Sequence, residues 1–84
     1  MFEFEFSAHS IEQMQLREID PEIVLEVVRH PDTIDREDSN QEVYQKLIKF
    51  GNNKNYLVRV IVNSAVNPKL IITVYRTSKL NKYI

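Results

Sequence analysis

The alternation of apolar and polar residues changes along the chain. Residues 2–6 alternate phenylalanine with glutamate, which is the period of two expected of a half-buried strand. Three longer segments, at 43–50, 56–62 and 70–75, are rich in β-branched and aromatic residues, and a shorter one occurs at 33–34. The pattern therefore predicts four strands after residue 32 and one short N-terminal strand that could lie at a sheet edge.

Between these strands, two segments have apolar residues at helical spacing. Ser7 is a suitable N-cap for a first helix over residues 8–17. Asp20 followed by Pro21 is a start signal for a second helix over residues 21–29, because proline at the first helical position loses no hydrogen bond. Both helices can bury an apolar stripe against the sheet.

Two turn signals complete the predicted architecture. Gly51 is the single glycine of the chain and is followed by asparagines, which favours a hairpin turn over residues 51–55, and residues 63–69 predict a second turn. The predicted fold class is α+β. It is one domain over residues 1–84, with two N-terminal helices packed on a four-stranded antiparallel sheet and residues 2–6 as a further edge strand.

Composition excludes several classes of chemistry. The chain has no cysteine, so it has no disulfide, thiolate metal site or thiol nucleophile. Its histidines, His9 and His30, lack the spacing of metal ligands, and one glycine cannot form a phosphate loop, so we expect no metal and no cofactor. The acidic start lacks the features of a signal peptide, and no run of 18 apolar residues occurs. We therefore expect a cytoplasmic protein that does not enter a membrane.

The charges are divided between the two halves of the chain. Residues 1–41 carry three Arg and eleven acids, a net charge of −8, whereas residues 42–84 carry six Lys and two Arg against Glu42, a net charge of +7. The total of −1 therefore hides a basic half that could face a polyanion such as RNA. The alternative explanation is that lysines keep the edges of the sheet soluble.

Three single residues are candidates for chemistry. His9 in the first turn of the first helix could transfer protons near neutral pH, although a histidine bonded to the nearby backbone is a simpler explanation. Arg17 closes the first helix, where a cation also complements the helix dipole. Arg59 interrupts the apolar segment 57–62, so its guanidinium must reach solvent, a carboxylate or a phosphate. If the helices cover the valine face of that strand, Arg59 stands on the open face.

The C-terminal segment is dense in cations and hydroxyl groups. Residues 75–83 hold three cations, two hydroxyls, two phenols and no acid. Cations suit phosphate contact, tyrosines can stack on bases, and RNA cleavage needs cations around the pentavalent phosphate. The candidate nucleic-acid contacts are Lys46, Arg59, Arg76, Lys79, Lys82 and Tyr83.

These residues form one site only if the last strand ends early. We expect it to end near Tyr75, so that Arg76 and Lys79 can fold back beside Arg59 and His9. A solvated basic tail is the alternative for the same residues.

Several short motifs, taken in order, resemble one small bacterial family built on a domain of unknown function. They are Phe6-Ser7-Ala8-His9, Met14 with Arg17, Ile19 before the Pro21-started helix, His30-Pro31-Asp32, Tyr44, Leu57-Val58-Arg59-Val60, Ile72-Thr73-Val74-Tyr75-Arg76-Thr77-Ser78-Lys79 and Lys82-Tyr83. That family is placed near the RelE/ParE and BrnT-like toxins of toxin-antitoxin systems. The resemblance implies a RelE-like or BrnT-like fold and a metal-independent ribonuclease encoded beside a small acidic antitoxin protein.

Carried onto this chain residue by residue, the resemblance implies a set of catalytic positions. They are His9, Arg17, Arg59, Tyr75 and Arg76. The net charge of −1 departs from the strongly basic character of RelE-type ribonucleases. The alternative function is a non-catalytic module that docks a partner protein or a nucleic acid through the basic half.

Overall fold

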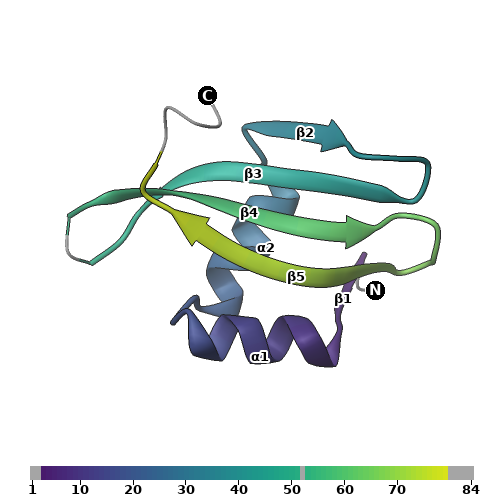
Figure 1. Cartoon of the computed structure of the whole chain (residues 1–84), viewed down its shortest axis with the longest axis horizontal. Helices are drawn as coiled ribbons and strands as arrows, with labels where there is room; N and C mark the ends of the chain where they lie inside the picture. Colours follow the sequence, from purple (N-terminus) through teal and green to yellow (C-terminus); the bar gives the residue numbers. More distant parts are fainter. Residues whose placement is uncertain (1–2, 52, 80–84) are drawn as a thin grey trace.

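Two short helices lie on one face of a five-stranded sheet in the computed structural model, which describes residues 3–51 and 53–79 (Figure 1). In chain order the elements are β1 (Phe4–Phe6), α1 (Ala8–Leu16), α2 (Pro21–Arg29), β2 (Thr33–Arg36), β3 (Gln41–Lys49), β4 (Asn55–Asn63) and β5 (Lys69–Thr77). The predicted α+β class and the order of one strand, two helices and four strands are confirmed.

The sheet is mixed, with its strands in the order β1-β5-β4-β3-β2. From β2 to β5 the strands form an antiparallel meander joined by turns. β1 adds to the outer edge of β5 and runs parallel to it, with Phe6 opposite Ile71. The predicted four-stranded antiparallel sheet is therefore a five-stranded sheet with one parallel pair. The chain leaves β1 through the helices, so no hairpin sets the direction of β1.

The apolar core lies between the helices and one face of the sheet. Val58, Val60 and Val62 of β4 alternate onto this face and are fully buried. Val24 and Val27 of α2 belong to the same cluster. Burying each valine side chain stabilises the fold by roughly 1.5–3 kcal/mol relative to exposure. Because α1 and α2 both lie on this face, neither helix covers the opposite face of the sheet (Figure 1).

Both predicted helix N-caps are present. Ser7 Oγ accepts a hydrogen bond from the Ser10 backbone N–H at 3.0 Å and donates one to the Ile72 carbonyl at 3.1 Å. Asp20 Oδ1 accepts a hydrogen bond from the Glu22 backbone N–H at 2.9 Å. Each cap contributes about 1 kcal/mol to helix stability, and the Ser7 cap also ties α1 to β5.

The β3–β4 hairpin forms at the predicted turn, but an asparagine takes its left-handed position. Asn53 has a φ of 64°, whereas Gly51 has no positive φ. The Phe50 N–H donates to the Lys54 carbonyl at 3.1 Å, and the Asn53 N–H donates to the Phe50 carbonyl at 2.9 Å. Asparagine visits this backbone region more easily than most side chains. The predicted turn at 63–69 likewise joins β4 to β5.

α1 ends in a Schellman motif whose left-handed residue is a glutamate. Glu18 has a φ of 54°, and its N–H donates to the Gln15 carbonyl at 3.3 Å. The Ile19 N–H donates to the Met14 carbonyl at 2.8 Å, and both of these side chains are buried. Glycine is usual at the position of Glu18, because a Cβ atom costs energy at positive φ.

Glu18→Gly should therefore raise the free energy of unfolding by about 0.5–1 kcal/mol, since the motif is kept and the strain is removed. Urea denaturation followed by circular dichroism measures the change. Glu12→Gly is the matched control, because Glu12 is exposed within α1 at a regular helical position, where glycine should cost about 1 kcal/mol. A Glu18→Gly protein less stable than wild type contradicts this account.

Candidate functional site

A row of four polar side chains crosses the sheet face that the helices leave uncovered. Thr33, Gln45, Arg59 and Tyr75 lie directly opposite one another on β2, β3, β4 and β5. Arg59 Nε donates a hydrogen bond to Gln45 Oε1 at 3.0 Å, and Gln45 Nε2 donates to Thr33 Oγ1 at 2.8 Å. Arg59 Nη1 donates to the Tyr75 hydroxyl. The register of the sheet therefore builds a continuous hydrogen-bonded row.

Arg59 lies on the face that the alternation of β4 predicts. Val58 and Val60 turn toward the helices, so Arg59 is left half-buried on the uncovered face. Its guanidinium carbon lies 5.6 Å from the centroid of the Tyr75 ring. A guanidinium beside a phenol can bind a phosphate oxygen and can assist a proton transfer at that phosphate.

Arg76 lies on the other side of the sheet from Arg59. β5 does not end near Tyr75 but continues to Thr77, and Arg76 pairs with Val58, whose side chain faces the helices. The predicted convergence of Arg76 with Arg59 is therefore wrong, because adjacent residues of a continuous strand point to opposite faces.

Arg76 instead belongs to a group of cations and aromatic rings where the β3–β4 hairpin meets the end of β5. We call this group the hairpin-end cluster, and its members are Phe50, Lys54, Tyr56, Arg76 and Lys79. The guanidinium carbon of Arg76 lies 4.4 Å from the Phe50 ring centroid and 4.8 Å from the Tyr56 ring centroid. The two rings meet edge to face at 5.2 Å, and Lys54 Nζ lies 5.6 Å from the Tyr56 centroid. Lys79 is exposed just beyond β5.

The Arg76 guanidinium has unused donor capacity. Within residues 3–51 and 53–79 its side chain forms neither a hydrogen bond nor an ion pair, and the residue is half-exposed. The two rings hold the guanidinium by cation–π contact, which occupies none of its N–H donors with a hydrogen-bond acceptor. Because no acidic residue follows Glu42 in the sequence, the hairpin turn, β4 and β5 contribute no acidic side chain to the cluster.

The two predicted residues of the first helix lie apart from both groups. His9 is exposed in the first turn of α1. Arg17 is exposed just after α1, where its Nε donates to Gln13 Oε1 at 2.9 Å. Since α1 packs on the helix side of the sheet, neither residue joins Arg59 on the uncovered face.

The remaining predicted nucleic-acid contacts have different positions. Lys46 Nζ donates to the His30 carbonyl at 2.9 Å, at the end of α2, and forms an ion pair with Asp32 at 3.6 Å. Lys46 therefore supplies a hydrogen-bond donor to a backbone carbonyl at the C-terminal end of α2. Lys82 and Tyr83 lie outside the described residues.

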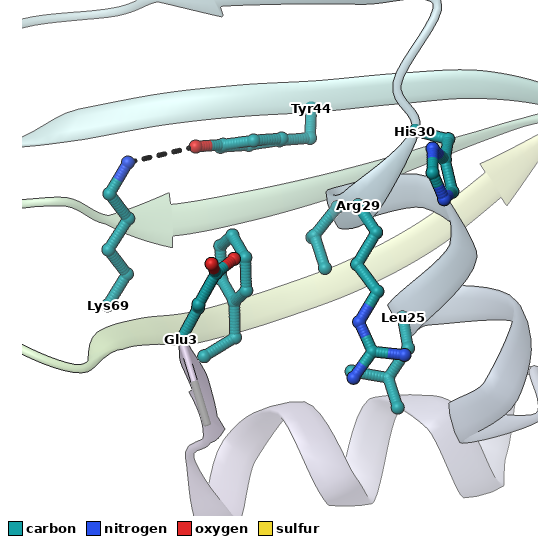
Figure 2. A pocket seen from close by; sticks show the side chains of 8 residues that line it. Glu3, Leu25, Arg29, His30, Tyr44 and Lys69 are labelled. Atoms are coloured by element: carbon teal, nitrogen blue, oxygen red, sulfur yellow. Dashed lines mark hydrogen bonds between the residues drawn. The ribbon is translucent and has the colours of Figure 1, made fainter. Parts of the chain in front are cut away.

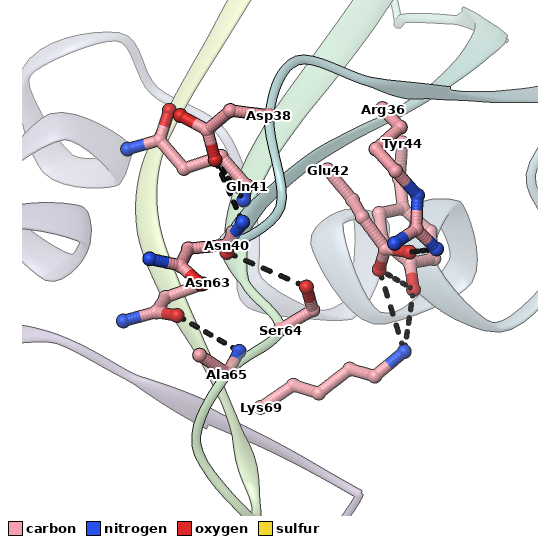
Figure 3. Close-up of polar contacts among 10 residues, drawn as sticks. All are labelled: Arg36, Asp38, Asn40, Gln41, Glu42, Tyr44, Asn63, Ser64, Ala65 and Lys69. Atoms are coloured by element: carbon pink, nitrogen blue, oxygen red, sulfur yellow. Dashed lines mark hydrogen bonds and ion pairs between the residues drawn. The ribbon is translucent and has the colours of Figure 1, made fainter.

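A buried carboxylate, that of Glu42, organises a third group of polar residues, at the end of β3 away from the hairpin (Figure 3). The Glu42 side chain is 10% exposed. The Tyr44 hydroxyl donates to Glu42 Oε1 at 3.0 Å, and Lys69 Nζ donates to the Tyr44 hydroxyl at 3.1 Å. Lys69 Nζ lies 3.4 Å from Glu42 Oε1, and Arg36 Nη2 lies 3.2 Å from Glu42 Oε2. The group joins β2, β3 and the start of β5.

These contacts set the charge states of the group. Burial alone would raise the pKa of Glu42, but the hydrogen bond from Tyr44 and the charges of Lys69 and Arg36 outweigh it, so the pKa lies below its ordinary value of 4.5. The hydrogen bond to Tyr44 and the Glu42 charge raise the pKa of Lys69 despite partial burial. Burial raises the pKa of the Tyr44 phenol. At neutral pH the group therefore contains a carboxylate, a neutral phenol and an ammonium.

A cavity of about 570 Å³ opens beside the Glu42 group (Figure 2). Its lining residues are Glu3, Phe4, Leu25, Val28, Arg29, His30, Tyr44 and Lys69. Sequence reasoning assigned no role to Lys69 or Glu3, because the cavity joins segments that are far apart in the chain. One feature of the sequence could have indicated the Glu42 group. Glu42 is the single acid after residue 41 and lies at the start of a segment predicted as a strand.

Neither helix of the described part has the length and apolar character needed to cross a membrane. In the same residues, no three His, Asp or Glu side chains are grouped so that they could hold a metal ion. Hydrogen bonds and charges are therefore the properties from which a function of these polar groups can be inferred.

Glu42→Gln should lower the free energy of unfolding by about 1–2 kcal/mol at pH 7, because the amide loses the charge that pairs with two partly exposed cations. The folded-state pKa of Glu42 is lowered, so the wild-type advantage exists above pH 4.5 and shrinks as the pH falls through the folded-state value. Urea titrations of both proteins between pH 7 and about pH 3 measure this difference. An advantage that stays undiminished at the lowest pH contradicts the charge assignment.

Comparison with known proteins assigns the chain to one family. The family model of DUF4258, described as a domain of unknown function, matches residues 6–76, from the end of β1 almost to the end of β5. No curated protein and no solved structure matches the chain. The matched segment holds the row of Arg59, the Glu42 group and all of the hairpin-end cluster except Lys79. The chain therefore belongs to the DUF4258 family of domains of unknown function.

Proposed function

We propose that the protein binds single-stranded RNA through the hairpin-end cluster. The observation that carries this proposal is the Arg76 guanidinium, which lies over the rings of Phe50 and Tyr56 and has no hydrogen bond or ion pair within the described residues. A guanidinium held by cation–π contact keeps its N–H donors, and their planar fork matches phosphate oxygens. Lys54 and Lys79 add two further cations at the same end of the sheet.

The aromatic rings of the cluster explain why the RNA is single-stranded. Phe50 and Tyr56 are both half-exposed. Bases of an unpaired strand can stack on such rings, and each stacked base contributes about 1–3 kcal/mol of binding free energy. A duplex hides the faces of its bases, so it cannot use this contact.

The division of charge supports a polyanionic ligand at this end. Residues 42–84 carry a net charge of +7 in a chain whose total is −1. Away from the cluster, Lys46 pairs with Asp32 and Lys69 pairs with Glu42. The cluster cations are built on segments without acids, so RNA is attracted to this end and repelled by the acidic half, which favours one orientation.

Arg76→Gln should weaken the binding of a uracil-rich RNA of about 12 nucleotides by about tenfold, because a charge-assisted phosphate contact is lost. Fluorescence anisotropy of a labelled RNA at two salt concentrations measures the affinity. Arg29→Gln is the matched control, because it removes the same charge from an exposed position on α2. The control protein should bind RNA as the wild type does, and wild-type binding should fall steeply with salt.

Two outcomes contradict this proposal. Equal losses in Arg76→Gln and Arg29→Gln would show that net charge alone decides affinity. A wild-type protein that does not bind RNA at low salt would leave the docking of a partner protein as the remaining use of the basic half, with an affinity that depends little on salt.

RNA cleavage is a second candidate function, and the contact between Arg59 and Tyr75 favours it. The guanidinium can stabilise negative charge on a pentavalent phosphate, and the phenol beside it can assist proton transfer without a metal. A relation to the RelE, ParE and BrnT-like toxins belongs to this candidate. So do a cytoplasmic location and a small acidic antitoxin protein that would neutralise the basic half.

Tyr75→Phe should slow cleavage of a labelled RNA by about 100-fold or more while RNA affinity is kept, because only the proton-transferring hydroxyl is lost. Gel analysis of RNA incubated with protein and EDTA measures cleavage, and slowed growth on expression is the matching effect in cells. Thr73→Val is the control, because it removes a hydroxyl from the same face of β5. Intact RNA with the wild-type protein would exclude cleavage and leave the binding proposal standing.

A further inference from the structure

Charged side chains of both signs line the cavity beside the Glu42 group (Figure 2). Glu3 lies on one side with Lys69, and Arg29 and His30 at the end of α2 lie on the other. Within residues 3–51 and 53–79, the side chains of Glu3 and Arg29 form no ion pair and no hydrogen bond, with each other or with any neighbour. A gap therefore separates a carboxylate from a guanidinium across the cavity.

The remaining lining of the cavity is apolar or aromatic, and part of it is shared with a second cavity. Phe4, Leu25 and Val28 contribute apolar side chains to its lining. Phe4 and Leu25 also line a second cavity of about 580 Å³, together with Glu5, Phe6 and Pro68. An apolar group that rests on Phe4 and Leu25 can therefore extend from the first cavity toward the second. Each volume lies in the range of roughly 300–1,000 Å³ that is usual for small-molecule sites.

The aromatic wall of the cavity is already held in place. The Tyr44 hydroxyl is fixed between Glu42 and Lys69, and its ring meets Phe4 edge to face at 5.7 Å. A wall fixed in this way does not have to be ordered when a ligand enters, which lowers the entropic cost of binding.

We propose that this cavity binds a free α-amino acid with an apolar side chain. The ammonium group pairs with Glu3, the carboxylate pairs with Arg29, and the side chain rests on Phe4 and Leu25. An α-amino acid carries its ammonium and carboxylate groups on the same carbon atom, so one ligand can pair with both Glu3 and Arg29. A simple anion leaves Glu3 without a partner and a simple cation leaves Arg29 without one, so both are disfavoured.

Three ligands of nearly the same shape test this proposal on the wild-type protein. They are L-phenylalanine, 3-phenylpropanoate, which lacks the ammonium group, and 2-phenylethylamine, which lacks the carboxylate. Isothermal titration calorimetry should show that L-phenylalanine binds at least about tenfold more tightly than either analogue, because each lost charged contact costs about that much in affinity.

Two variants identify the walls. Glu3→Gln should remove the advantage of L-phenylalanine over 3-phenylpropanoate, and Arg29→Gln should remove its advantage over 2-phenylethylamine. Lys49→Gln is the control, because Lys49 is an exposed cation at the far end of β3 and does not line the cavity. It should keep the wild-type ranking of the three ligands.

The order of the three ligand affinities is measured on the wild-type protein. The test therefore remains possible even if a variant does not fold. Equal affinities of the wild type for the three ligands overturn the proposal. So does the absence of L-phenylalanine binding at concentrations up to about 10 mM, or a ranking that folded Glu3→Gln and Arg29→Gln proteins leave unchanged. RNA affinity is a separate measurement at the hairpin-end cluster, so failure there is distinguishable from failure here.

Discussion

The alternation of side chains along β4 determines both the core of the protein and the positions of its two polar sheet surfaces. Its valines must face the helices to form the core, so Arg59 must face the other way. The sheet register then sets the neighbours of Arg59 in the polar row, and it turns Arg76 on β5 to the helix side. Arg59 on β4 and Arg76 on β5 therefore lie on opposite faces of the sheet, although their strands are adjacent.

The cations at the two ends of the sheet are held by different interactions. Lys69 and Arg36 both pair with the buried carboxylate of Glu42, so their charges serve to hold β2, β3 and β5 together. Arg76 is held by aromatic rings, which stabilise the cation without neutralising it. This difference is the physical reason why we propose RNA binding at the hairpin-end cluster and not at the Glu42 group.

Features that depend on short segments could be predicted from the sequence, and features that depend on distant partners could not. The caps at Ser7 and Asp20 and the face of Arg59 follow from local spacing and alternation. The end of the last strand was predicted wrongly, because it was placed near Tyr75 so that Arg76 could join Arg59, whereas pairing with β4 carries β5 to Thr77. The parallel β1 and the cavity depend on contacts between segments far apart in the chain, for which alternation gives no signal.

NMR chemical-shift mapping shows which residues RNA contacts, and we propose that they belong to the hairpin-end cluster. Titration of the labelled protein with a single-stranded RNA should perturb the backbone amides of residues 53–56 and 76–79 and leave those of α2 and β2 unchanged. Perturbations centred on α1 or α2, or spread evenly over the molecule, would contradict the account. A map centred on Arg59 and Tyr75 would move the site to the uncovered face of the sheet and would contradict it as well.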